Sequence, residues 1–436
     1  MLTKLRIKNF KCLQDTGDLE IRPLTFLVGP NSSGKSSLLQ MLLILRQTVD
    51  STDINNPLST SNGWIKMGAY PEFIYKHEIN RNLEVNLEFT EYIISKKGKN
   101  KKPRKILLNS TFCYNRKTTQ IKLKEREIKL DNSACERIFR DQKRKKYSMT
   151  LSFLENEKPK EWHRTNVSPI KFYNFSFSLK RGEKLENLKK VLPSQEILFR
   201  LGNIIENEFR KLIYLGPLRE FPKRFYVTSG QAPQDVGIRG ERAVDVLWFS
   251  HRSGSKRMLK IEEKTRNWLK KFNIANNIRL DHLGKGNYYR IIIIDPVTEV
   301  ETNLADIGFG ASQTIPIIIE SFYASPDSII LIEQPEIHLH PKAQSILGDL
   351  FINSINEERR TFIIETHSEH ILNRVRRRIA EGKIKKEDVI IYYFENTFDG
   401  TNIQEVKLNE KGQYYKFPEG FFEEAYNEAV EHLEAL

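Results

Sequence analysis

The stretch GPNSSGKS, at residues 29–36, is the feature that most restricts how this chain can fold. It fits the pattern G-x-x-x-x-G-K-[ST], in which the glycines let backbone amides turn toward a phosphate. The apolar run LTFLV precedes it directly, and leucines recur after it at helical spacing. A buried strand, a tight anion-binding turn and a helix are therefore predicted in this order.

The residues of this phosphate loop have expected roles. Lys35 is expected to reach the β- and γ-phosphates of ATP, and the Ser36 hydroxyl to bind Mg²⁺. A glycine-rich turn that only caps a helix is the alternative, which the complete motif and its context disfavour. The residues predicted to bind nucleotide are Gly29, Pro30, Asn31, Ser32, Ser33, Gly34, Lys35, Ser36 and Ser37.

Strand and helix patterns alternate in the last third of the chain. The buried-strand runs are YYRIIIID, SIILIE, TFIIET and VIIYYFEN, and helical patterns follow the second and third. This alternation predicts parallel βαβ units, which bind ligands at the carboxyl ends of their strands. The second run ends at Glu333, and the third delivers His367, a candidate γ-phosphate contact, to the same sheet edge.

A small glycine turn lies about twenty residues before the acidic strand, in LADIGFGASQ. Such a turn before a helix can present N–H groups to a phosphate. The residues predicted to do so are Gly308, Gly310, Ser312 and Gln313.

Taken in order, these motifs resemble those of ABC-class P-loop ATPases of the RecF, SMC and OLD type. They are Phe10-Lys11, GPNSSGKSS, a GxGxSQ turn, an apolar strand running into E-x-P-E-x-H-L-H-P, and T-H-S. The closest resemblance is to stand-alone AAA-type ATPase subunits of bacterial anti-phage defence systems, of the Septu or PARIS type. FPEGFFEEAYNEA, at 417–429, looks like their C-terminal tail. The resemblance covers about 1–90 and 205–436.

The resemblance implies that ATP is sandwiched between two protomers. Lys35 and Ser36 would act in cis, and Ser312 with the Gly308–Gly310 backbone in trans. His338 and His340 would sense the partner's site.

In place of the family's acidic pair, this chain has Glu333-Gln334. By that resemblance Glu333 organises Mg²⁺, and Gln334 stands where the general base would be. A glutamine can still orient the attacking water, and Glu336 could act through a second water. Because loss of a general base costs about 10²–10⁴-fold, slow hydrolysis is expected.

The predicted fold is α/β: an ABC-type P-loop ATPase head with a mixed or parallel sheet, flanking helices and an N-terminal antiparallel sheet. It carries a strand-rich basic insertion and a helical lobe. The predicted division is 1–90 with the phosphate loop, 91–180 for the insertion, 181–280 for the lobe, and 281–436 with the glycine turn, acidic strand and histidine.

The net charge of +14 is concentrated in one segment of the chain. Between Lys96 and Lys146 there are 19 Lys or Arg against 5 Asp or Glu. This basic segment is a candidate nucleic-acid surface or a solvated insertion, and KKGKNKKPRK at 96–105 is predicted to be a loop. The three cysteines are widely spaced and lack a CxxC pattern, which favours reduced packing thiols.

No apolar run reaches the roughly 18 residues of a membrane span, so a cytoplasmic protein without membrane contact is expected. A transition-metal site built from His338, His340, His367, His370 and Glu333 is a weaker alternative, because Mg²⁺ and phosphate already account for this neighbourhood.

Three functions remain open. The leading one is a slow regulatory ATPase that oligomerises on ATP and controls a separately encoded nuclease effector in anti-phage defence. The second is a RecF-like repair ATPase that binds DNA directly, and the third is a scaffold that binds ATP without hydrolysing it. The segment after His367 lacks the D-x-D pair of OLD nucleases, so a nuclease within the chain is not expected.

Overall fold

The structure is a computed structural model that describes residues 1–61, 63–94, 101–131, 134–141, 146–155, 158–177, 195–228, 230–284, 287–416 and 430–432. Its contacts divide the chain into two compact units. The first consists of Met1–Ile21, Pro30–Leu212 and Phe394–Ile403, and the second of Arg22–Gly29, Ile213–Tyr393 and Gln404–Leu436. The four-part division predicted from the sequence stays a prediction.

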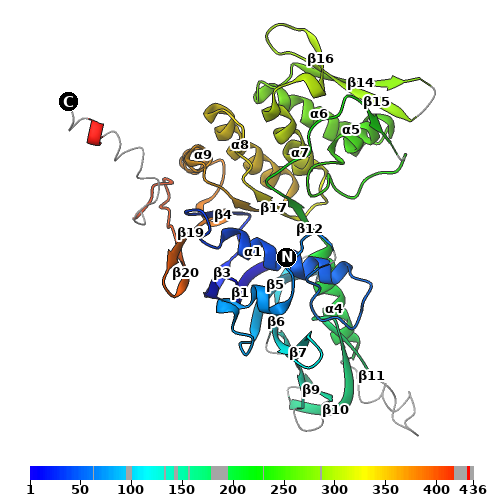
Figure 1. Cartoon of the computed structure of the whole chain (residues 1–436), viewed down its shortest axis with the longest axis vertical. Coiled ribbons are helices and arrows are strands. Elements are labelled where there is room, and N and C mark those ends of the chain that lie inside the picture. The colour runs from blue at the N-terminus through cyan, green and yellow to red at the C-terminus, as the bar shows by residue number, and fades with distance from the viewer. Residues whose placement is uncertain are drawn as a thin grey trace. The chain divides into compact units, whose positions relative to one another are not determined.

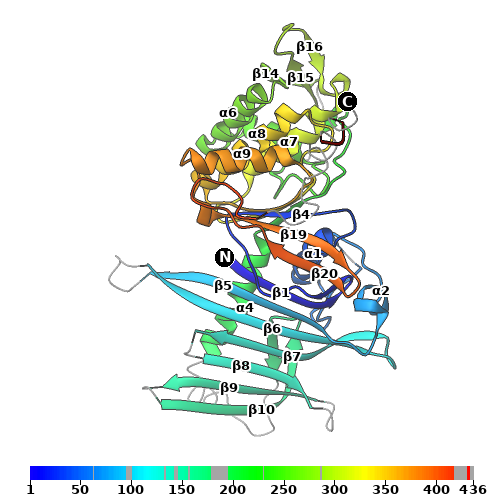
Figure 2. The same ribbon diagram turned by 90° about the vertical axis from the view of Figure 1, so that its left-hand side faces the viewer.

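The first unit is built on an antiparallel sheet with the strand order β11-β10-β9-β8-β7-β6-β5-β1-β2, and β3 also pairs with β1. Figure 2 shows β5 to β10 lying side by side. The strands are β1 (Leu2–Phe10), β2 (Leu13–Asp15), β3 (Leu19–Glu20), β5 (Leu83–Ile94), β6 (Lys101–Asn115), β7 (Gln120–Leu130), β8 (Ala134–Arg140), β9 (Tyr147–Glu155), β10 (Lys158–Ile170) and β11 (Asn174–Phe177).

The strand-rich segment continues the N-terminal sheet. β1 pairs with β5 so that Leu5 lies opposite Leu87. The predicted N-terminal antiparallel sheet and the strand-rich insertion are both confirmed. The structure shows in addition that they form one continuous sheet.

The loop predicted at 96–105 is wrong for its second half, because β6 already begins at Lys101. Pro103 pairs with Tyr92 of β5, whereas pairing with β7 starts only at Ile106. Proline is tolerated on such a one-sided stretch, where its missing N–H interrupts no second ladder. Residues 95–100 lie outside the described part of the chain.

The helix after the phosphate loop forms as predicted. α1 (Lys35–Asp50) buries all of its leucines, and most of its other side chains are buried too. A helix that is apolar around most of its circumference belongs in a core. The other helical elements of this unit are α2 (Tyr70–Phe73), η1 (Tyr75–His77) and α4 (Gln195–Arg210).

The second unit contains most of a sheet with the order β12-β17-β18-β4-β19-β20. β17, β18, β4 and β19 run parallel, and the residues of β4, β17 and β18 are all buried, as their continuous apolar runs predict. The strands are β12 (Leu212–Leu215), β17 (Ile329–Glu333), β18 (Thr361–Glu365), β4 (Leu24–Val28), β19 (Val389–Thr397) and β20 (Gly400–Glu405).

Three parallel strands end together at the edge where ligands bind in such sheets. Glu333 lies opposite Glu365, which lies opposite Leu27, and Gly29 begins the phosphate loop two residues later. Figure 1 shows α7, α8 and α9 together beside this sheet. These helices are α7 (Phe309–Tyr323), α8 (Pro341–Glu358) and α9 (Glu369–Ala380), and a short η3 (Lys386–Asp388) precedes β19.

The parallel pairing predicted for YYRIIIID is wrong. This run forms β15 (Tyr288–Ile294), which pairs antiparallel with the preceding strand β14 (Asn277–Leu283) in a separate small sheet. An apolar run shows that a strand is buried but not which strand it pairs with. The remaining elements are β13 (Tyr226–Val227), α5 (Ala243–Arg252), α6 (Lys256–Lys271), β16 (Glu301–Asn303) and η2 (Leu304–Asp306).

All three cysteines carry free thiols. Across the described ranges, none of the helices has both the length and the apolar character needed to cross a bilayer.

Candidate functional site

The phosphate loop has the backbone that its glycines predict. Gly29 and Gly34 have φ angles of 136° and 100°, in the region that favours glycine. Gly34 also precedes α1 as its N-cap and provides no side chain to cap the first helical amides. The loop therefore leads into a helix N-terminus whose partial positive charge suits an anion.

Gly34 is required for a second reason. A Cβ placed there would lie 2.8 Å from both Cys12 Sγ and Thr401 Oγ1. The Thr401 hydroxyl in turn donates a hydrogen bond of 2.9 Å to the carbonyl of Ser33. Thr401 of β20 and Cys12 therefore pack against the phosphate loop.

Lys35 folds back over its own loop. Its Nζ donates a hydrogen bond of 2.6 Å to the carbonyl of Pro30, and the side chain is buried. The Ser33 hydroxyl is buried without a hydrogen-bond partner among the described residues. A lysine beside an inward-turning backbone and a helix N-terminus fits a nucleotide phosphate chain, as the sequence predicts.

Glu333 ends β17 in a nearly closed environment. The side chain of Tyr214, in β12, donates a hydrogen bond of 2.8 Å to Glu333 Oε1. Burial and the nearby Glu365 carboxylate raise the pKa of Glu333 to about 7. A divalent cation at this carboxylate would favour its charged form, so the residue fits the predicted Mg²⁺-organising role.

Arg219 holds the end of this strand by its backbone. Its Nη2 donates a hydrogen bond of 2.9 Å to the Glu333 carbonyl, and its Nη1 one of 3.1 Å to the Gln334 carbonyl. The side chain is fully buried, and burial lowers its pKa to about 10. Because this value is still well above 7, the guanidinium stays charged at neutral pH. Arg219 therefore fixes the acidic strand and does not face outward.

Gln334 is anchored on its other side as well. Its backbone N–H donates a hydrogen bond of 2.8 Å to the carbonyl of Glu365, and its φ is 44°, in the left-handed region. Its side chain remains partly exposed. The backbone thus presents the Gln334 side chain in a defined, uncommon conformation.

Glu336 points to the next strand. Its Oε1 accepts a hydrogen bond of 2.6 Å from the backbone N–H of His367. Its Oε2 is buried and makes no hydrogen bond of ordinary geometry with the described residues. Burial raises the pKa of Glu336, and the Thr366 side chain opposes this shift by favouring the charged form. The structure thus connects Glu336 and His367, and the His367 ring itself is exposed.

The glycine turn before α7 is shorter than predicted. The helix begins at Phe309, so Gly310, Ser312 and Gln313 lie in its first turns and Gly308 is its N-cap. Ser312 and Gln313 are buried, and the Gln313 Nε2 has no hydrogen-bond partner among the described residues.

This helix start packs closely on the loop after β17. A Cβ at Gly310 would lie 2.9 Å from the carbonyl oxygen of His338. His338 is exposed and has a φ of 62°, and His340 caps α8 by accepting a hydrogen bond of 3.3 Å from the Lys342 N–H. His338, one of the two histidines predicted to sense a partner, therefore lies beside the predicted signature turn.

The transition-metal alternative gains no support. Within the described ranges there is no group of three or more His, Cys, Asp or Glu placed to hold a metal ion.

The basic segment is less uniformly exposed than its sequence suggests. Arg126 is completely buried and forms a salt bridge with the buried Glu136 of the neighbouring strand. Exposed cations such as Arg137 are partly compensated, here by Glu125. Six of its basic residues lie outside the described part of the chain: Lys96, Lys97, Lys99, Lys143, Arg144 and Lys145.

Neither Tyr214 nor Arg219 is among the site residues predicted from the sequence. Both contact the end of β17 across more than a hundred residues of chain. No local pattern in YLGPLRE indicates that pairing.

Comparisons with known proteins agree with these motifs. Residues 24–373 match the family model described as "AAA domain, putative AbiEii toxin, Type IV TA system". Residues 384–431 match a model described as a protein of unknown function (DUF3696).

An OLD nuclease of Thermus scotoductus is 50% identical over 42 residues, which are 10% of this chain and 8% of that protein. The chain thus matches only a small part of that relative's length.

Solved SMC head structures are distant likenesses. The SMC head domain from Thermotoga maritima has a TM-score of 0.41 at 12% identity, covering 93% of this chain and 99% of that one. The SMC head bound to the C-winged helix domain of ScpA has a TM-score of 0.45 at 13% identity, covering 94% and 98%.

The family match includes β4, the phosphate loop, the glycine turn, β17 and β18, and it confirms the predicted kinship with OLD-like P-loop ATPases. The chain belongs to the family described as "AAA domain, putative AbiEii toxin, Type IV TA system".

Proposed function

We propose that this protein is a slow ATPase that uses ATP binding and hydrolysis as a switch. The observation that carries the proposal is the end of β17, where Glu333 is followed by an amide whose backbone is fixed on both sides. Positioning and charge stabilisation dominate phosphoryl transfer, so replacing the base slows the reaction without abolishing it.

In the proposed reaction, Lys35 exchanges the Pro30 carbonyl for phosphate oxygens, and the amides at the start of α1 hold the remaining charge. By the family resemblance, Ser36 and Glu333 would hold Mg²⁺, which would neutralise charge on the phosphates. The Gln334 side chain orients the attacking water through its carbonyl oxygen.

Glu336 has a different part in this proposal. Its carboxylate already accepts the backbone N–H of His367 and is largely enclosed. We assign it to positioning His367, which contacts the γ-phosphate, and not to taking the proton.

The proposal includes a pair of protomers. Ser312 and the Gly308–Gly310 backbone of one chain would contact ATP bound by Lys35 of the other. The close approach of Gly310 to His338 supports a common interface, because it places the glycine turn beside the exposed histidine. Slow hydrolysis would keep such a pair together for a long time.

The biological setting is proposed by resemblance: the ATPase subunit of an anti-phage defence complex that restrains or activates a separate nuclease. The similarity of one short segment to an OLD nuclease and the family description support this setting. Copurification of a neighbouring nuclease with the tagged chain, in an ATP-dependent manner, would test it.

Turnover of the purified full chain tests the enzyme proposal. We expect ATP hydrolysis below the roughly 1 s⁻¹ lower limit of typical enzymes. Lys35→Ala should remove nucleotide binding, and Ser312→Arg should retain binding but lose turnover. A wild-type rate of tens per second that Glu336→Gln leaves unchanged would contradict a slow switch.

Direct DNA binding is the second candidate, favoured by the cations of β6, β7 and β8. Binding should then weaken steeply with salt, and neutralising Lys101, Lys102, Arg104 and Lys105 should reduce the slope. A salt-independent or absent signal would exclude this candidate.

A further inference from the structure

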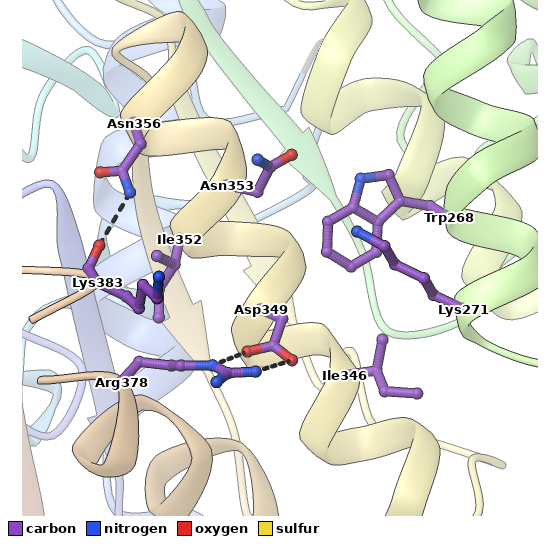
Figure 3. A pocket seen from close by; sticks show the side chains of 9 residues that line it. All are labelled: Trp268, Lys271, Ile346, Asp349, Ile352, Asn353, Asn356, Arg378 and Lys383. Carbon is purple, nitrogen blue, oxygen red and sulfur yellow. Dashed lines mark hydrogen bonds and ion pairs between the residues drawn. The ribbon is translucent and has the colours of Figure 1, made fainter. Parts of the chain in front are cut away.

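A groove of about 660 Å³ opens in the second unit between α6, α8 and the end of α9. In Figure 3, Trp268 and Lys271 lie on one side of the α8 side chains, and Arg378 and Lys383 lie on the other. Its volume is within the range of roughly 300–1,000 Å³ that is usual for binding sites. None of these residues belongs to the proposed ATPase site.

The charge of the groove is not balanced by its own residues. Its one acidic side chain, Asp349, is already paired with Arg374 and with Arg378, whose Nε lies 2.6 Å from Asp349 Oδ1. Lys271 and Lys383 are exposed, and no carboxylate of the described residues lies within salt-bridge distance of either. Two ammonium groups therefore face the groove uncompensated.

The groove also has an apolar lining, in which Trp268 is 4% exposed. The Nζ of Lys271 lies 4.0 Å from the centroid of the Trp268 ring, and Ile346 contributes aliphatic surface. An occupant that matches this lining carries negative charge together with aromatic or aliphatic groups.

The same chain contains a segment of that composition. Residues 417–436 include six glutamates and neither lysine nor arginine, although the whole chain has a net charge of +14. The segment also carries four aromatic residues: Phe417, Phe421, Phe422 and Tyr426.

The described chain that leads into this segment is fastened to α9. Arg376 donates a hydrogen bond of 2.7 Å to the Gly412 carbonyl, and its guanidinium lies 3.9 Å from the Tyr414 ring centroid. Arg376 is on the helix that also carries Arg378. Twenty residues span about 30 Å even when helical.

We propose that the acidic segment 417–436 docks in this groove of its own chain, with glutamates against Lys271 and Lys383 and an aromatic ring beside Trp268. The association needs no nucleotide, so its failure would leave the proposed ATPase function untouched. Long-range charge attraction and burial of aromatic surface both favour it.

Lysine acetylation of the folded protein, read by mass spectrometry, tests the docking. In the full chain Lys271 and Lys383 should react several-fold more slowly than in a chain that ends at Lys416. Lys385, which is exposed outside the groove, is the internal control and should react equally in both.

Charge reversal provides an independent variant. Glu423→Lys/Glu424→Lys/Glu428→Lys should unmask Lys271 and Lys383 as deletion does, and a synthetic 417–436 peptide should shield them again in the shortened chain. Equal reactivity in the full and shortened chains would overturn the proposal. Shielding that rises with protein concentration would also overturn it, because the segment would then come from a second copy.

Discussion

We propose that the Gln334 side chain sets the rate of ATP hydrolysis, while hydrogen bonds fix its backbone. The Arg219 guanidinium holds its carbonyl, and the Glu365 carbonyl accepts its N–H. A substitution at this position therefore changes the chemistry of the side chain without removing either anchor.

Gln334→Glu should raise the ATP turnover number. The new carboxylate can accept a proton from the attacking water, and general-base catalysis contributes typically about 10²–10⁴-fold. Steady-state hydrolysis by the purified chain, with Lys35→Ala as the inactive control, measures the change. An unchanged or lower rate in a folded, ATP-binding variant would show that Gln334 does not occupy the base position.

Glu320 is a second residue whose environment predicts a measurable effect. It is fully buried in α7, and one of its oxygens accepts the Val236 N–H. The other oxygen has no hydrogen-bond partner among the described residues. Burial, reinforced by Asp235 and opposed by Arg360 and Arg242, raises the pKa of Glu320 to about 8. Its carboxyl thus stays protonated in the folded protein at pH values where the unfolded chain releases the proton.

Glu320→Gln should stabilise the protein increasingly as the pH rises. Between pH 4.5 and 8 the contribution of Glu320 to the wild-type free energy of unfolding falls, because the unfolded state loses a proton that the folded state retains. The slope approaches about 1.4 kcal/mol per pH unit, and the variant lacks it. Urea unfolding at pH 5, 6.5 and 8 measures the difference, with the exposed Glu263→Gln as control. Parallel pH profiles would contradict the assigned protonation.

Among the elements, α7 is tied to the loop after β17 by the absence of a side chain at Gly310. Gly310→Ala should lower the midpoint of thermal unfolding, although alanine usually favours a helix by about 1 kcal/mol. The new methyl group would press on the His338 carbonyl, which is backbone and cannot rotate away. Gly308→Ala is the matched control, because a Cβ there meets nothing within 4 Å.

The end of β17 depends on Arg219 in a comparable way. Arg219→Met should lower the free energy of unfolding by roughly 2–4 kcal/mol, because buried carbonyls lose hydrogen bonds to a charged donor. Arg224→Met is the control: its salt bridge to Asp306 is exposed and should contribute at most about 1 kcal/mol. Denaturant unfolding compares the two, and equal losses would contradict the assigned role of Arg219.

At the scale of the whole molecule, the two-protomer proposal predicts complementation. Lys35→Ala and Ser312→Arg should each be inactive, and mixing them should restore up to about a quarter of wild-type turnover. Half of randomly formed pairs are mixed, and each mixed pair has one intact composite site. No recovery, despite demonstrated subunit exchange, would place both residues in one protomer's site.

The sequence predicts those parts of the molecule that local pattern determines. Lys35 and the strands β4, β17 and β18 follow from one motif and three continuous apolar runs, because burial and phosphate binding impose residue types at fixed spacing. Pairing between distant segments leaves no such pattern. The partner of β15 and the bonds from Tyr214 and Arg219 to the end of β17 therefore emerge only from the structure.

The double anchoring of residue 334 has an evolutionary consequence. Glutamine and glutamate codons differ by a single first-position base, and neither anchor involves the side chain. A lineage with this fold can therefore change between fast and slow ATP hydrolysis through one point mutation, because the exchange leaves both backbone hydrogen bonds in place.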